Sequence, residues 1–127
     1  MLERSGRPVF LDLTKIRLPA VGVMSICHRI SGVILFLSIP LVIGLLGLSL
    51  ADADGFSKAQ AITDHILFKL ALIGWSWALA HHFLAGVRIL LIDIDVGIEK
   101  LCARASAKAV LAGGVVIAAI VAIGGLL

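Results

Sequence analysis

Long stretches without charged residues dominate the hydrophobic pattern of the chain. They cover residues 30–50, 70–87 and 109–127. Each is close to the roughly 20 residues that an α-helix needs to cross the hydrocarbon core of a bilayer. The pattern therefore predicts an all-α membrane protein with three transmembrane helices. We expect these spans at about residues 21–50, 63–92 and 102–127.

Composition agrees with a chain embedded in a membrane. Of its 127 residues, 61% are hydrophobic, and the mean hydropathy of +1.14 lies outside the range of soluble domains. Pro8 and Pro19 discourage a regular helix in residues 1–20, so we expect an irregular N-terminal arm on the membrane surface ahead of a three-helix unit at 21–127. The arm lacks the compact apolar region of a signal peptide, so the first span is expected to stay uncleaved.

Lysine and arginine residues are distributed unequally around the spans. One group lies before or at the start of the first span, and a second surrounds the connection between the other two: Arg4, Arg7, Lys15, Arg17 and Arg29, then Arg88, Lys100, Arg104 and Lys108. The first connection, where Asp54-Gly55 predicts a turn, has mainly acidic residues. The positive-inside rule places the N-terminus and the second connection on the cytoplasmic side. The net charge of +3 reflects this rule, and no basic stripe for nucleic acid is present.

Two adjacent histidines, His81 and His82, lie within the second predicted span. Ionisable residues at membrane depth are rare and are functional candidates by default. His82 precedes Asp93, where we expect the helix to end, by eleven residues, which is roughly 16 Å along an α-helix and places His82 near the middle of the bilayer. Adjacent helical positions differ by about 100° in direction, so the two histidines cannot serve one target.

Small residues flank His82 on its face of the helix, namely Ala78 on one side and Ala85 and Gly86 on the other. We expect them to leave room for a flat macrocycle whose iron a neutral imidazole could ligate. The residues alone leave three interpretations of the histidines open: haem ligation, a proton relay and hydrogen bonds between helices.

The stretch SICHRISG, residues 25–32, places polar groups at the start of the first span, where we expect interfacial depth. Ser25 and Arg29 are four residues apart and share a helical face. Their hydroxyl and guanidinium could bind an oxygen that develops negative charge during reduction. His28 points about 100° away and could donate to a carboxylate such as a haem propionate. Alternatively, Arg29 reaches the lipid headgroups and Ser25 bonds to its own helix.

An acidic group follows the second span, where Asp93, Asp95 and Glu99 come after Arg88. Carboxylates beside a redox site could relay protons. The alternative is a solvated, charge-balanced turn that ends the helix.

Other chemistry is not indicated by the sequence. Cys27 and Cys102 both fall on the reducing side of the predicted topology, so we expect no disulfide. Soluble-enzyme motifs such as the P-loop, HExxH and CxxC are absent, and we assign no catalytic residue to this chain.

Three sequence features occur in an order that resembles one known family. They are Arg7-Pro8, the pattern S-x-x-H-R-x-S over residues 25–31 and the pattern H-x-x-x-G-V-R-x-x-x-x-D over residues 82–93. Together they resemble the cytochrome b556 membrane-anchor subunits of succinate dehydrogenase, respiratory complex II, over nearly the whole chain. Two departures are Ile89, where many relatives have a histidine, and His81, where relatives often have an aromatic residue.

The resemblance implies roles for five residues. It implies that His82 is an axial ligand of a non-covalent haem b, whose other ligand comes from a second three-helix anchor subunit. It implies that His28 and Arg29 lie near the haem propionates and that Ser25 and Arg29 contact ubiquinone. It also implies a position for Asp93 near the quinone end of its helix, with a role in proton delivery.

The function implied is that of a membrane anchor of succinate:quinone oxidoreductase in a bacterial inner membrane, with flavoprotein and iron–sulfur subunits performing the dehydrogenation. One alternative is an anchor of a fumarate reductase or another quinone-linked dehydrogenase. Another is a small transporter, although such proteins usually contain repeats or broken helices. A third is a purely structural anchor in which the histidines make packing contacts.

Overall fold

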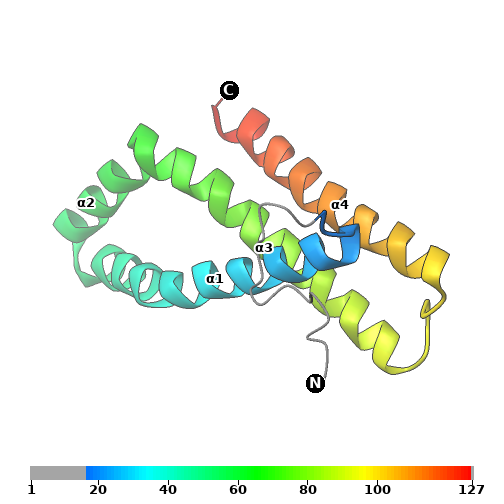
Figure 1. The fold of residues 1–127 in the computed structure, drawn as a ribbon. Coiled ribbons are helices and arrows are strands. Elements are labelled where there is room, and N and C mark those ends of the chain that lie inside the picture. Colours follow the sequence, from blue (N-terminus) through cyan, green and yellow to red (C-terminus); the bar gives the residue numbers. More distant parts are fainter. Residues whose placement is uncertain (1–16, 127) are drawn as a thin grey trace, which may run out of the picture.

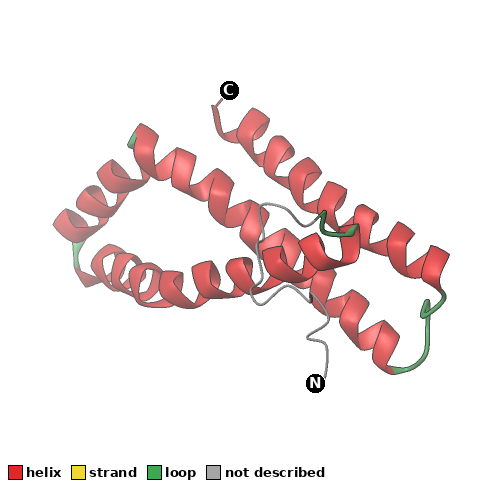
Figure 2. Ribbon diagram, in the orientation of Figure 1, coloured by secondary structure: helices red, strands yellow, loops and turns green. Residues whose placement is uncertain are grey.

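The computed structural model describes residues 17–126, and every regular element in that range is an α-helix (Figure 1, Figure 2). The helices are α1 (Ala20–Ala51), α2 (Ala53–Asp64), α3 (Ile66–Asp93) and α4 (Lys100–Leu126). By length and composition, α1, α3 and α4 are each able to cross a membrane. The predicted all-α fold with three long apolar helices is therefore confirmed.

The three long helices match the predicted spans to within three residues at each end. They contain 32, 28 and 27 residues, which at 1.5 Å per residue is about 40 Å or more and exceeds a hydrocarbon core of about 30 Å. Large apolar side chains such as Phe36 and Leu41 point outward, exposed by 71% and 73%. The predicted arm falls mostly on residues 1–16, outside the described residues.

The connection between α1 and α3 is a helix, so the predicted turn at Asp54-Gly55 is wrong. Asp52 is the N-cap of α2, and its carboxylate accepts a hydrogen bond from the Gly55 amide at 2.6 Å. This cap places the dipeptide in the first turn of the helix instead of in a loop. Gly55 and Ala59 are buried, and α2 holds the adjacent ends of α1 and α3 apart at one end of the bundle (Figure 1).

A short turn joins α3 to α4 at the opposite end. The last residue of α3 is Asp93, as the acidic residues there predicted. Asp95 and Gly97 then take left-handed backbone conformations, with φ of 61° and 77°. Asparagine, aspartate and glycine tolerate this region best, which explains why the chain reverses here.

Small residues allow the long helices to approach one another near this end. Met24 of α1, Ala85 of α3, and Ala107 and Val110 of α4 form a buried cluster. Apolar burial gives little drive inside lipid, so small residues that permit close packing are the usual means of association between membrane helices. The start of α1 therefore packs against both α3 and α4, and this junction contains the candidate site (Figure 1).

Candidate functional site

His82 faces α1 from the middle of α3. Its Nδ1 lies 3.2 Å from the backbone carbonyl oxygen of His28 and 3.3 Å from the hydroxyl of Ser31. The Ser31 side chain is completely buried, and its hydroxyl donates to the same His28 carbonyl at 2.8 Å. One carbonyl of α1 thus receives hydrogen bonds from both a side chain of its own helix and the histidine of α3.

This arrangement selects one tautomer of His82. A carbonyl oxygen only accepts, and the Ser31 proton is already directed at that oxygen, so the contact is favourable when Nδ1 of His82 is protonated. The neutral ring then has an unprotonated Nε2 with a free lone pair. Fixing one ring nitrogen with a hydrogen bond so that the other can bind a metal is the usual arrangement of a histidine ligand.

Two glycines determine the space around the His82 ring. A methyl group added at Gly32 would lie 3.0 Å from Cε1 of His82, so α1 can approach the ring this closely because residue 32 has no side chain. One turn after His82, a methyl group at Gly86 would meet no atom within 4 Å. The ring therefore has close packing on its α1 side and open space toward Gly86.

The two alanines expected to leave room for a macrocycle do not do so. Ala78 and Ala85 are fully buried, and Ala85 belongs to the cluster that joins α3 to α1 and α4. Their small size serves the packing of helices. Gly86 is the member of that predicted set that borders open space.

His81 points in another direction from His82, as the helical geometry required. Its side chain is completely buried, its Nε2 lies 3.4 Å from the carbonyl oxygen of Met24, and its ring stacks on Trp77 with centroids 5.4 Å apart. The environment is enclosed on all sides, in contrast to that of His82. Of the adjacent pair, His82 has the open side that an external ligand needs.

The other residues of the first motif lie on α1 beside His82. The His28 ring stacks on the His82 ring, with centroids 4.3 Å apart and planes 20° from parallel. Ser25 is half-buried and Arg29 is exposed. The structure therefore brings His28, Ser25 and Arg29 to the same region as His82, and the role of His28 toward a propionate stays a prediction.

Asp93 is not brought to this group. It ends α3 and is exposed, eleven residues beyond His82 and so roughly 16 Å along the helix. Met24 contacts His81, which places the neighbouring Ser25 near the level of the histidines instead. A role for Asp93 in proton delivery stays a prediction.

The predictions of an interfacial Arg29 and a mid-bilayer His82 are incompatible with each other. The contact between His82 and the His28 carbonyl puts Arg29 and His82 at one level of the bundle. A charged side chain at the centre of a bilayer is costly, so this shared level favours a position near the polar boundary. The number of residues between His82 and Asp93 did not reveal this shared level, because α3 and α4 extend beyond the start of α1 (Figure 1).

The structure also reveals the role of Arg88. Its side chain is 7% exposed; its Nε donates to the hydroxyl of Ser106 at 2.9 Å and its Nη2 to the carbonyl of Ala103 at 3.0 Å. Among the described residues, the Arg88 side chain therefore binds these two neutral acceptors and does not pair with Asp93 or the neighbouring carboxylates. No sequence pattern indicated this contact, because its acceptors, a serine and a backbone carbonyl, are ordinary in any helix.

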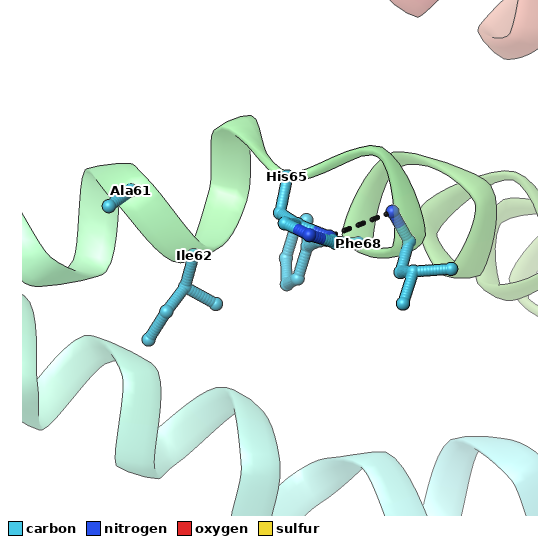
Figure 3. A pocket seen from close by; sticks show the side chains of 5 residues that line it. Ala61, Ile62, His65 and Phe68 are labelled. Atoms are coloured by element: carbon cyan, nitrogen blue, oxygen red, sulfur yellow. Dashed lines mark hydrogen bonds between the residues drawn. The ribbon is translucent and has the colours of Figure 1, made fainter.

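A separate pocket of about 510 Å³ lies at the far end of the bundle, where α2 meets α3 (Figure 3). It is lined mainly by apolar side chains, including Ile62 and Phe68. The exposed His65 lines it too, but Nδ1 of His65 accepts a hydrogen bond from the Leu67 amide at 3.2 Å and thereby caps α3. This histidine serves helix formation, and the pocket lacks the converging polar groups of the junction around His82.

Together, the long apolar helices and the histidine between α1 and α3 define a class: helical membrane subunits with a candidate cofactor ligand between helices. The sequence profile of the family described as succinate dehydrogenase/fumarate reductase transmembrane subunit matches residues 3–122. The chain belongs to this family.

Three relatives are each named succinate dehydrogenase cytochrome b556 subunit. The protein of Paracoccus denitrificans is 35% identical over 117 residues, which cover 92% of this chain and 90% of the relative. That of Coxiella burnetii is 42% identical over 89 residues, 69% of this chain and 71% of the relative. That of Rickettsia typhi is 31% identical over 91 residues, 72% and 70% respectively. The family suggested by the motifs is thereby confirmed.

Proposed function

We propose that this chain is a membrane-anchor subunit of a succinate:quinone oxidoreductase, that it holds haem b together with a second anchor subunit, and that it forms part of the ubiquinone reduction site. Flavoprotein and iron–sulfur subunits would oxidise succinate and deliver the electrons. The names of the relatives support the first part of this proposal. The geometry around His82 supports the second part.

The observation that supports haem binding best is the fixed orientation of the His82 ring. With Nδ1 bound to the His28 carbonyl, Nε2 is available as a metal ligand. The open space at Gly86 suits a flat group beside the ring, and the half-buried position of His82 limits access of water. Haem b, when bound through two imidazoles, supplies one-electron transfer without an open coordination position on the iron.

A difference spectrum tests this assignment. We expect the purified complex to show the reduced-minus-oxidised bands of a low-spin b haem, and His82→Ala to remove or greatly weaken them. The control is His65→Asn, because His65 lies at the opposite end of α3 and asparagine retains an acceptor for the helix cap. Unchanged bands in His82→Ala would exclude His82 as the ligand.

The proposed quinone site uses Ser25 and Arg29 on one face of α1. During reduction a quinone carbonyl oxygen gains negative charge, and a guanidinium and a hydroxyl can both donate hydrogen bonds to it. Donors that strengthen their bonds as charge develops lower the barrier for the reduction step. The exposed Arg29 and half-buried Ser25 are accessible to a molecule that enters from the membrane.

Parallel assays with two electron acceptors test this site. We expect Ser25→Ala and Arg29→Leu to lower quinone reduction by succinate, by roughly tenfold or more, as for the loss of a hydrogen-bond donor to a developing charge. Reduction of a soluble dye by succinate should be unchanged, because that reaction does not use the membrane site. Equal losses in both assays would mean that the substitutions do not act specifically on quinone reduction, and this would contradict the proposed role.

The direction of the reaction separates this proposal from the nearest alternative, an anchor of a fumarate reductase, since the family description covers both. All three named relatives are succinate dehydrogenase subunits, and this favours succinate oxidation. The proposed location is a bacterial inner membrane with the N-terminus on the cytoplasmic side, which the lysine and arginine distribution supports.

A further inference from the structure

We propose that His81 is a positioning residue that fixes the register of α1 against α3, and thereby sets where Ser25 and Arg29 lie relative to His82. This inference rests on the proposed function of those three residues. His81 is completely buried and has no open side, so it acts through its neighbours and not through contact with a ligand.

The two adjacent histidines of α3 contact two carbonyls that are one turn apart on α1. Nε2 of His81 lies 3.4 Å from the oxygen of Met24, and Nδ1 of His82 lies 3.2 Å from the oxygen of His28. Both acceptors are backbone carbonyls, so the histidine nitrogens donate. Two contacts at successive turns determine both the position of α1 along α3 and its rotation, which one contact leaves free.

The contacted residues are the immediate neighbours of the proposed quinone ligands. Ser25 follows Met24, and Arg29 follows His28. Moving α1 by one residue along its axis, about 1.5 Å with a rotation of about 100°, would turn the pair to another face. The His81 contact therefore controls the direction in which both side chains point.

Packing from Trp77 of α3 and from α4 holds the His81 ring in place. The ring stacks on Trp77, with planes 17° from parallel. A methyl group added at Gly114 of α4 would lie 3.1 Å from Cβ of His81, which shows how closely α4 covers this side chain. His81 thus has little freedom to turn away from Met24.

Burial of this imidazole has a cost that an apolar ring would avoid. Among residues 17–126, its buried Nδ1 has no hydrogen-bond partner, and an unpaired buried polar atom is unfavourable. A phenylalanine would fill a similar volume and stack on Trp77 without that cost. The contribution specific to histidine is the bond from Nε2 to Met24.

Replacement of His81 in the intact complex separates this bond from packing. His81→Phe keeps the ring and removes the donor, whereas His81→Gln has an amide nitrogen at the position of Nε2. We expect His81→Phe to raise the KM for a short-chain ubiquinone about fivefold, the effect of losing one hydrogen bond of ordinary strength. The low-spin haem signal in electron paramagnetic resonance should shift, since the orientation of His82 depends on α1.

His81→Gln should restore the KM to within about twofold of wild type, since one hydrogen bond is regained. Succinate oxidation by a soluble dye should be the same in all variants. If His81→Phe does not assemble, His81→Asn, whose amide is one bond too short, provides the impaired variant for comparison with His81→Gln.

The inference would be overturned if His81→Phe, or His81→Asn in its place, had the KM and haem signal of wild type. It would also be overturned if glutamine and phenylalanine gave the same defect, because shape alone would then explain the effect. A wild-type complex that lacks both haem and quinone reduction would instead overturn the proposed function, and this inference with it.

Discussion

Ser31 links two helices through a single oxygen atom. Its hydroxyl donates to the His28 carbonyl and lies 3.3 Å from Nδ1 of His82. Because its proton is used within α1, the serine cannot donate to Nδ1 as well, and this favours the tautomer with a free Nε2. Ser31 lies one helical turn after His28 on the same face of α1. From there it supports the ring of His82 on α3.

The effect of Ser31→Ala on haem binding follows from this contact. We expect Ser31→Ala to weaken haem retention by roughly tenfold, as for residues that orient a metal-bound histidine. The ratio of haem to flavin in the purified complex measures it. Ser49→Ala is the matched control, because Ser49 also donates to a carbonyl of α1, that of Leu46, but lies near the other end of the helix. Equal ratios in the two variants would contradict the role assigned to Ser31.

At the scale of the helices, α3 and α4 are connected by a buried guanidinium that binds neutral acceptors. Arg88 reaches across to Ser106 and to the carbonyl of Ala103. Arginine suits this position because its planar group offers several donors in fixed directions. The contact lies on the side of His82 toward the α3–α4 turn, so it holds α4 against the part of α3 that follows the site.

Removal of the Arg88 contacts should loosen α4. We expect Arg88→Leu to lower the stability of the complex by about 2 kcal/mol, since hydrogen bonds from a charged donor are lost and Ser106 and Ala103 lose a partner. Ser106→Ala should cost less, because the bond to Ala103 remains. Thermal unfolding in detergent measures both effects. Arg104→Ala, an exposed arginine of α4, is the control, and a loss there equal to that of Arg88→Leu would contradict this account.

At the scale of the whole molecule, most of the apolar surface faces outward. On α1 the buried residues are Met24 and Ser31, and the side chains beyond them are largely exposed. In water such a surface would cause aggregation, whereas in a membrane it faces lipid or another apolar helix. The junction of α1, α3 and α4 is therefore the part of the described chain where intramolecular contacts determine the structure most strongly.

The orientation of the molecule in the membrane is testable with a membrane-impermeant thiol reagent. We expect Lys58→Cys on the exposed surface of α2 to be labelled in cells with a permeable outer membrane. The native Cys102, exposed at the start of α4, should react only in inverted vesicles. A Cys27→Ala background removes the other thiol. If Cys102 were labelled in cells and residue 58 only in inverted vesicles, the proposed topology would be contradicted.

The sequence predicted the spans more fully than it predicted the surroundings of His82. The charge-free runs predicted α1, α3 and α4 because lipid imposes both the length and the composition of a spanning helix. The same reasoning missed α2, whose start depends on the Asp52 cap and whose buried face rests on α1. His82 stood out because a histidine is rare in such a span. Ser31 belonged to the first motif but received no role, and Gly32 received none either, because both residue types are common in membrane helices.

The pattern of apolar residues was enough to predict a membrane protein with three spans, and the motifs indicated the family, because these properties depend on residues close together along the chain. Three features depend on the tertiary structure. It buries His81 and leaves one side of His82 open, it puts His82 and Arg29 at one level, and it provides the partners of Arg88. These depend on how far each helix extends beyond its neighbours and which faces meet. Both are set by contacts between residues more than a dozen positions apart, such as the close approach of Gly32 to His82.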